Sequence, residues 1–270
     1  MNEARDGQSI PPEVYDREYF LSEICEGWDE FREDRGVSFN KAKQVELLAP
    51  RSGLRILDAG CGRGEVLLAC ARRGAEVAGV DYSGAAIEIT RETLSEFPEA
   101  DLRVGDVTAL PWEDDAFDRV QFSDVIEHLD PPQTVPALSE FHRVLRPGGY
   151  LLVHTAPNRL FMDVGWPLVR PALRVLGHRE VVEGVDAWFR LAEGYHVNEQ
   201  SLHSLRRALR EAGFSAPRVW IDPDVMRSGN YHLISGLERG AMMGVARRLA
   251  ALRPVRLFLG NDVFSLAEKR

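Results

Sequence analysis

Cysteine is scarce in this sequence and shows no metal-binding or redox spacing. It occurs only at Cys25, Cys61 and Cys70, an odd number without a Cys-x-x-Cys pair. This pattern gives no support for a disulfide framework or a zinc knuckle, and it indicates a reducing compartment. Lysine is also rare, at three of 33 basic residues. A GC-rich genome accounts for that bias, although arginine also suits oxyanion binding.

Long apolar runs are missing as well. No run approaches the roughly 20 residues of a membrane span, and the polar N-terminal stretch lacks the apolar core of a signal peptide. We therefore expect a cytoplasmic protein. The net charge of -9 argues against a protein that mainly neutralises nucleic-acid phosphates. With 270 residues, of which 44% are hydrophobic, the chain can bury a sizeable core.

Short runs rich in β-branched residues alternate with helical segments through the middle of the chain. Such alternation predicts an α/β fold, in which a parallel sheet binds its ligand beyond the carboxyl ends of the strands. The predicted strands are residues 55–57, 76–80, 102–104, 117–122, 150–154, 217–221 and 262–267. The predicted helices are residues 14–28, 38–48, 64–73, 83–97, 133–145, 167–176 and 199–212.

The most informative stretch is a strand that runs into a glycine turn, Ile-Leu-Asp-Ala-Gly-Cys-Gly-Arg-Gly-Glu, at residues 56–65. Its glycines allow a sharp turn and a close approach of a ligand to the backbone. The spacing differs from the G-x-G-x-x-G dinucleotide fingerprint, because Glu65 replaces the last glycine. Asp58, which precedes the turn, suits a cationic group better than a pyrophosphate.

Carboxylates also end the next two predicted strands. Asp81 closes the second strand, where a carboxylate can accept both hydroxyls of a ribose, and Asp106 follows the third. Asp106 is placed to receive an exocyclic amine, with the Val107 N–H free for a ring nitrogen. One such aspartate is usually a helix cap or turn residue, but three at successive strand ends are hard to assign to capping.

Together with Phe-Asp-Arg-Val-Gln-Phe-Ser-Asp-Val-Ile-Glu-His-Leu at 117–129 and Leu-Arg-Pro-Gly-Gly-Tyr at 145–150, these motifs resemble the class I S-adenosylmethionine (SAM) methyltransferases. The likeness is closest to the type 11 group of quinone, natural-product and sugar methyltransferases. It implies a Rossmann-like seven-stranded sheet in the order 3-2-1-4-5-7-6, mostly parallel, with an antiparallel last strand. It also implies a cytoplasmic enzyme of biosynthesis that uses SAM and releases S-adenosylhomocysteine.

The resemblance assigns the cofactor residues position by position. Asp58, Gly60 and Gly62 would frame the methionine moiety, Asp81 the ribose, and Ser123 would offer its carbonyl to the methionine ammonium. The implied cofactor-binding residues are Asp58, Gly60, Cys61, Gly62, Asp81, Tyr82, Asp106, Val107, Ser123 and Tyr19, with Tyr82 packed against adenine and Tyr19 in a lid.

Two histidines are the predicted catalytic residues, namely His128, just past the fourth strand, and His196, at the return from a cap. Each also has a structural alternative: His128 as a buried residue that orients its loop, and His196 as a helix cap. The predicted substrate contacts are Tyr15, His154, Asn158 and Tyr195. Methyl transfer from a sulfonium requires no metal, and no ligand spacing demands one, so we predict no metal site.

The chain divides into a helical lid (1–50), a cofactor-binding core (51–157), a cap (158–197) and the completion of the core (198–270), with a second helical insertion at about 224–258. Residues 157–256 carry a charge of +5 and the remainder -14. Basic amphipathic stretches in this basic region are usually helices with one solvated face, but they would also suit a lipid-linked or anionic acceptor.

We therefore predict a methyltransferase acting on oxygen or nitrogen of a small-molecule acceptor, as a monomer or homodimer, without nucleic acid and with peripheral lipid contact as an option. Three rivals stay open: an NAD-dependent oxidoreductase or epimerase, a non-catalytic SAM-binding scaffold, and a methyltransferase for a lipid-linked acceptor.

Overall fold

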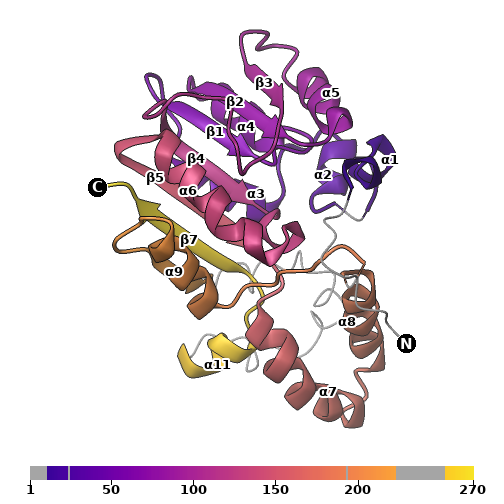
Figure 1. Ribbon diagram of the computed structural model, residues 1–270. Helices are drawn as coiled ribbons and strands as arrows, with labels where there is room; N and C mark the ends of the chain where they lie inside the picture. The colour runs from indigo at the N-terminus through magenta and orange to yellow at the C-terminus, as the bar shows by residue number, and fades with distance from the viewer. Residues whose placement is uncertain (1–10, 24, 193, 223–252) are drawn as a thin grey trace.

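The computed structural model describes residues 11–23, 25–192, 194–222 and 253–270, and it contains one seven-stranded sheet (Figure 1). The strand order is β3-β2-β1-β4-β5-β7-β6, and β7 runs antiparallel to β5 and β6. The order and the antiparallel last strand both confirm the prediction. The strands are β1 (Arg55–Ala59), β2 (Glu76–Asp81), β3 (Asp101–Val104), β4 (Phe117–Ser123), β5 (Leu145–Thr155), β6 (Arg218–Ile221) and β7 (Val263–Glu268).

Helices cover both faces of the sheet because alternate strand residues point to opposite sides. Leu57 belongs to the core under α6 (Thr134–Val144) and α9 (Leu202–Glu211), whereas its neighbour Ile56 belongs to the core under α3 and α4. Those two helices are α3 (Phe39–Leu48) and α4 (Glu65–Ala71), and α5 (Gly84–Thr93) follows β2. This burial on two faces fixes the sheet and leaves its carboxyl edge to the connecting segments.

The N-terminal segment is not the single helix predicted for residues 14–28. It forms the 3-10 turn η1 (Pro12–Val14) and two short helices, α1 (Arg17–Phe20) and α2 (Trp28–Arg32). Asp16 accepts a hydrogen bond from the Tyr19 N–H at 2.8 Å and starts a new helix there, while Gly27, with φ of 79°, separates α2 from what precedes it. Tyr15 and Phe20 pack with Ala86 and Ile89 of α5. We call the described residues from η1 to α2 (11–23 and 25–32) the lid, which is part of the helical lid predicted for residues 1–50.

The segment after β5 forms a helical pair with a small core of its own, which stands apart from the sheet (Figure 1). It contains η4 (Phe161–Gly165), α7 (Trp166–Val175) and α8 (Arg179–Ala192). The sequence predicted α7 but missed α8. Phe161, Trp166, Val182 and Val185 are buried against one another, so the pair is stabilised by apolar contacts independent of the sheet.

The remaining elements are η2 (Ile126–His128), η3 (Pro131–Gln133) and α11 (Arg253–Leu259). Most of the second helical insertion predicted at 224–258 lies outside the described residues. Among the helices that the structure describes, none is long and apolar enough to cross a membrane.

Candidate functional site

Three of the predicted cofactor residues lie near the carboxyl ends of neighbouring strands, and Asp106 follows β3, which is parallel to β2. Asp58, Asp81 and Ser123 lie in β1, β2 and β4, which are parallel neighbours. Their shared direction places all three carboxyl ends at the same edge. The structure thus places these groups at one edge of the sheet, and their individual cofactor contacts stay predictions.

The glycine turn is tight because two of its backbone groups bond back to β2. The N–H groups of Gly60 and Cys61 both donate to the Val80 carbonyl, at 2.7 and 3.1 Å. Gly60 has φ of 80°, and a Cβ there would lie 2.2 Å from a methyl carbon of Val125. Both facts require glycine at position 60. The Cys61 side chain is buried beside Thr90, and its carbonyl accepts from the Gly64 N–H at 2.8 Å.

Asp81 is fixed by two backbone donors. Its carboxylate accepts from the Gly62 N–H and the Ser83 N–H, each at 3.0 Å. Burial raises the pKa of Asp81 to about 6, although those hydrogen bonds lower it. The side chain thus bridges the glycine turn and the end of β2, which is where the resemblance places a ribose.

Asp58 is a buried carboxyl in an acidic environment. Burial raises its pKa to about 8, Lys41 opposes the shift, and Asp81, Glu65 and Asp124 add to it. A cationic ammonium at this point would stabilise the carboxylate form. These groups therefore fit the methionine end of SAM. Asp58 and the Ser123 carbonyl would hold its ammonium group.

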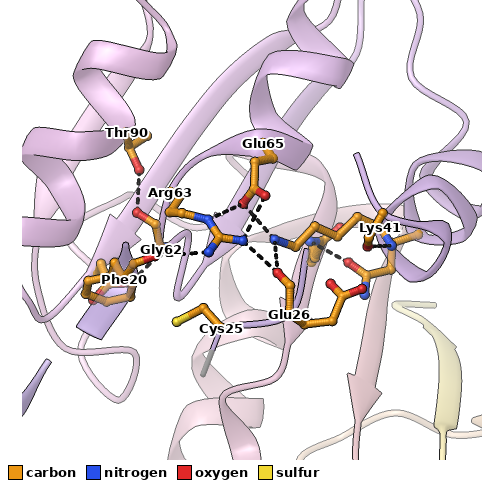
Figure 2. A network of polar contacts seen from close by, with 12 residues as sticks. Phe20, Cys25, Glu26, Lys41, Gly62, Arg63, Glu65 and Thr90 are labelled. Atoms are coloured by element: carbon orange, nitrogen blue, oxygen red, sulfur yellow. Dashed lines mark hydrogen bonds and ion pairs between the residues drawn. The ribbon is translucent and has the colours of Figure 1, made fainter. Parts of the chain in front are cut away.

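An ion network that the sequence reasoning missed ties the lid to the glycine turn (Figure 2). Arg63 donates to the carbonyls of Phe20 and Glu26, at 3.0 and 2.6 Å, and to both oxygens of Glu65, at 3.2 and 3.0 Å. Lys41 contacts Glu65 at 2.6 Å and the Glu26 carbonyl at 3.0 Å. Burial alone would raise the pKa of Glu65, but the two cations outweigh it and the pKa is lowered.

Asp106 makes a local turn at the end of β3. Its Oδ1 accepts from the N–H and the hydroxyl of Thr108, both at 2.8 Å, while Val107 is buried. This arrangement is the turn role that an aspartate at a strand end commonly has. The carboxylate remains exposed enough for the adenine contact that the resemblance implies, and that contact stays a prediction.

Aromatic rings line the lid side of the edge. The Tyr15 ring lies 4.8 Å from Tyr19, 5.5 Å from Tyr82 and 6.4 Å from Tyr195, measured between centroids. Tyr19 and Tyr195 are 5.5 Å apart. The four predicted tyrosines thus form one group, built from the lid, the end of β2 and the return from the cap.

His128 and His196 are brought together beside this group. Their ring centroids are 4.8 Å apart, edge to face. His128 Nδ1 lies 3.0 Å from the Tyr195 carbonyl and 3.0 Å from the Tyr15 hydroxyl. A carbonyl can only accept, so Nδ1 carries the proton and Nε2 holds the free lone pair.

His196 does not cap a helix, because Ser201 is the N-cap of α9. Its Nδ1 is buried without a hydrogen-bond partner among the described residues. Burial, and then the neighbouring His128, lower the pKa of His196 to about 3, and burial also lowers the pKa of His128. Both imidazoles are therefore neutral near pH 7.

His154 and Asn158, two of the predicted acceptor contacts, both bind other groups of the protein. His154 is buried, with Nδ1 2.9 Å from Asp124 and Nε2 3.1 Å from Asp262. Burial would lower the pKa of His154, but these two carboxylates outweigh it and raise the pKa well above its usual value. Asn158, fully buried, donates to the carbonyls of Leu257 and Gly260 at 3.1 and 2.9 Å. Both side chains bind the protein itself, which favours structural roles.

The chain belongs to the class I SAM-dependent methyltransferases. Residues 56–149 match the methyltransferase domain family. A demethylmenaquinone methyltransferase of Clavibacter sepedonicus is 31% identical over 176 residues, which cover 64% of this chain and 70% of that protein. SAM is thus the cofactor of this enzyme, as the motifs predicted.

Two further relatives are matched over little more than half their length. An uncharacterised 37.1 kDa protein in a transposon of Streptomyces fradiae is 36% identical over 214 residues, covering 76% of this chain and 56% of that one. A ubiquinone biosynthesis O-methyltransferase of Paracidovorax citrulli is 33% identical over 143 residues, covering 50% and 59%. A geranyl diphosphate methyltransferase in complex with SAM shares the fold, with a TM-score of 0.61 at 18% identity and coverage of 93% and 94%.

Proposed function

We propose that this enzyme methylates a hydroxyl group of a small aromatic acceptor, such as a quinone precursor. The main support is that two neutral imidazoles, His128 and His196, lie beside the group of four tyrosines. Aromatic walls hold flat rings, and a free imidazole nitrogen accepts a hydroxyl proton. The P. citrulli relative, named an O-methyltransferase of ubiquinone biosynthesis, supports oxygen as the acceptor atom.

The protein's own residues would position the acceptor and accept its hydroxyl proton. SAM supplies a methyl group on a sulfonium, from which a neutral thioether departs. Orientation of the acceptor in line with that methyl group is worth roughly 7–11 kcal/mol. The chain's own residues would hold the acceptor oxygen in line with that methyl group, and His128 Nε2 would accept the hydroxyl proton. A positioned base of this kind contributes about 10²–10⁴-fold.

The lid supports the remaining requirement, exclusion of water. Tyr15 is buried between His128 and α5, and Arg63 holds the lid backbone at Phe20 and Glu26. A closed lid would keep the reacting groups dry. Asp58, Asp81 and Ser123 would hold the cofactor underneath it, with Asp106 and Val107 at the adenine end.

Incubation with methyl-labelled SAM tests the proposal. We expect label in mono- and dihydroxybenzoate acceptors, with transfer to hexose and primary-amine acceptors at least about tenfold slower. A host metabolite extract, treated in the same way, identifies the natural product. Labelling confined to sugars or amines would contradict the aromatic hydroxyl.

A second candidate keeps the chemistry but places the acceptor in a lipid. The helix α7 and the turn after it expose Leu168, Val175 and Leu176, at 70%, 88% and 58%, beside Arg174 and Arg170. Arg170 and Arg174 both pair with Asp186 but stay 40% and 54% exposed, and exposed apolar side chains near exposed arginines suit an anionic membrane surface. This observation favours an acceptor carried on a lipid tail, with α7 as the docking element.

A further inference from the structure

Three groups with metal-ligand chemistry converge beside the tyrosines. Glu127 and His128 lie in η2, after β4, and His196 lies on the return from the cap. One ligand atom from each lies within 4.8 Å of the other two. The sequence could not show this, because the spacing of Glu127 and His128 alone has no metal signature.

The backbone holds the three groups in place. The N–H groups of Val197 and Asn198 both donate to the Glu127 carbonyl, at 2.8 and 3.1 Å. These bonds fix the His196 segment against η2. The Asn198 side chain adds a hydrogen bond to the Ile126 carbonyl at 3.1 Å. The convergence is therefore built into the fold rather than left to long, free side chains.

Each group offers a ligand atom. Glu127 is 1% exposed, and Thr155 donates to its Oε2 at 2.9 Å, which leaves Oε1. His128 offers Nε2, because its Nδ1–H donates to the Tyr195 carbonyl. His196 has a buried Nδ1 without a hydrogen-bond partner among the residues described. An orphaned buried nitrogen of this kind requires an explanation.

We propose that Glu127, His128 and His196 bind a divalent transition-metal ion of the zinc type, and that this ion inhibits the methyl transfer. Two imidazoles and one carboxylate form a donor set that zinc uses with an open fourth position, whereas magnesium and calcium prefer oxygen ligands throughout. The Tyr195 carbonyl supplies the outer hydrogen bond that metal-bound histidines almost always make.

Inhibition follows from the lone pair that the ion occupies. A metal on His128 Nε2 removes the nitrogen that accepts the acceptor's proton. The binding site stands on its own geometry, and only the inhibition rests on the proposed function. The methyltransferase would then lose activity reversibly as the ion is added, and a chelator would restore it.

Cobalt(II) titration of untagged, EDTA-treated protein tests the site without any turnover, because cobalt(II) reports its ligands through visible absorption. We expect one equivalent to bind, zinc(II) to displace it, and His196→Gln to weaken binding at least about tenfold. His203→Gln serves as the control, since His203 is exposed on α9. Equal cobalt binding by the wild type and His196→Gln, or no binding at one equivalent, overturns the site.

Activity then separates the two proposals. Zinc(II) should inhibit methyl transfer by the wild type over the concentration range in which it displaces cobalt. If the ion binds but activates the reaction, the site stands, while the inhibition and the role of His128 as proton acceptor are overturned together. If zinc inhibits His196→Gln as strongly as the wild type, its inhibition does not come from this site and the proposal fails.

Discussion

Glu65 joins Arg63 and Lys41 in one buried ion cluster at the first turn of α4. Arg63 and Glu65 are less than a tenth exposed, and three nitrogens lie within 3.2 Å of the carboxylate. The arginine also holds two carbonyls of the lid. The residue that distinguishes this turn from a dinucleotide fingerprint therefore anchors the segment that covers the cofactor edge.

Removing the charge of Glu65 should lower the free energy of unfolding. Glu65→Gln leaves the buried Arg63 and the partly buried Lys41 facing an uncharged amide, and breaking a buried pair in this way typically costs about 3–5 kcal/mol. Denaturant unfolding measures the change. Glu96→Gln is the matched control, because its pair with Arg72 is exposed and should be worth less than about 1 kcal/mol. Equal losses in the two variants would contradict the importance of the buried cluster.

Asp81 should control cofactor affinity and its pH dependence. Asp81→Ala removes the carboxylate that would bind the ribose, and we expect SAM binding to fall below detection by calorimetry while circular dichroism is unchanged. Because burial raises the pKa of Asp81 to about 6, wild-type affinity should decline as the pH falls below that value. Undiminished affinity in Asp81→Ala would refute the cofactor assignment.

Asp58 should make the cofactor-free protein less stable as the pH rises. Its folded pKa of about 8 lies above the ordinary 3.8, so the folded state binds more protons between those values. Stability from this group is thus full below about pH 4 and is lost towards pH 8, by at most about 1.4 kcal/mol per pH unit. The unfolding free energy of Asp58→Asn, relative to wild type, should rise from pH 5 to pH 8. A constant difference would show that the Asp58 pKa is not raised.

Membrane docking through α7 is tested with vesicles rich in phosphatidylglycerol. We expect the protein to co-sediment with them at low salt. A double variant, Val175→Glu with Leu176→Glu, should lose most of that binding. Val104→Glu is the control, since Val104 is 59% exposed on β3. Failure of the wild type to bind would remove the lipid-linked acceptor.

The sequence predicted the sheet well because its signals are local. A strand such as β1 has its own apolar run and glycine turn, and Asp58 and Asp81 mark strand ends that parallel packing must bring together. The lid was harder, because Asp16 and Gly27 divide it into short helices within a stretch that looks continuously helical.

The sequence predicted less of the site, because contacts between residues far apart in the chain decide how its side chains are placed. His154 looked accessible at the end of a strand, but Asp262 of the segment before β7 binds it. The clustering of Arg63, Glu65 and Lys41, like that of Glu127 with His196, depends on how separate elements pack. The division into lid, core, cap and completed core remains a prediction.

The role of His128 is the central claim, and single-turnover methyl transfer measures it most directly. With labelled SAM and a hydroxybenzoate acceptor, we expect His128→Gln to slow transfer by about 10²–10⁴-fold while the dissociation constant of SAM changes little. Raised pH should partly restore the rate, because an acceptor that ionises in solution no longer needs a base. An unchanged rate in His128→Gln at pH 7 would contradict the account.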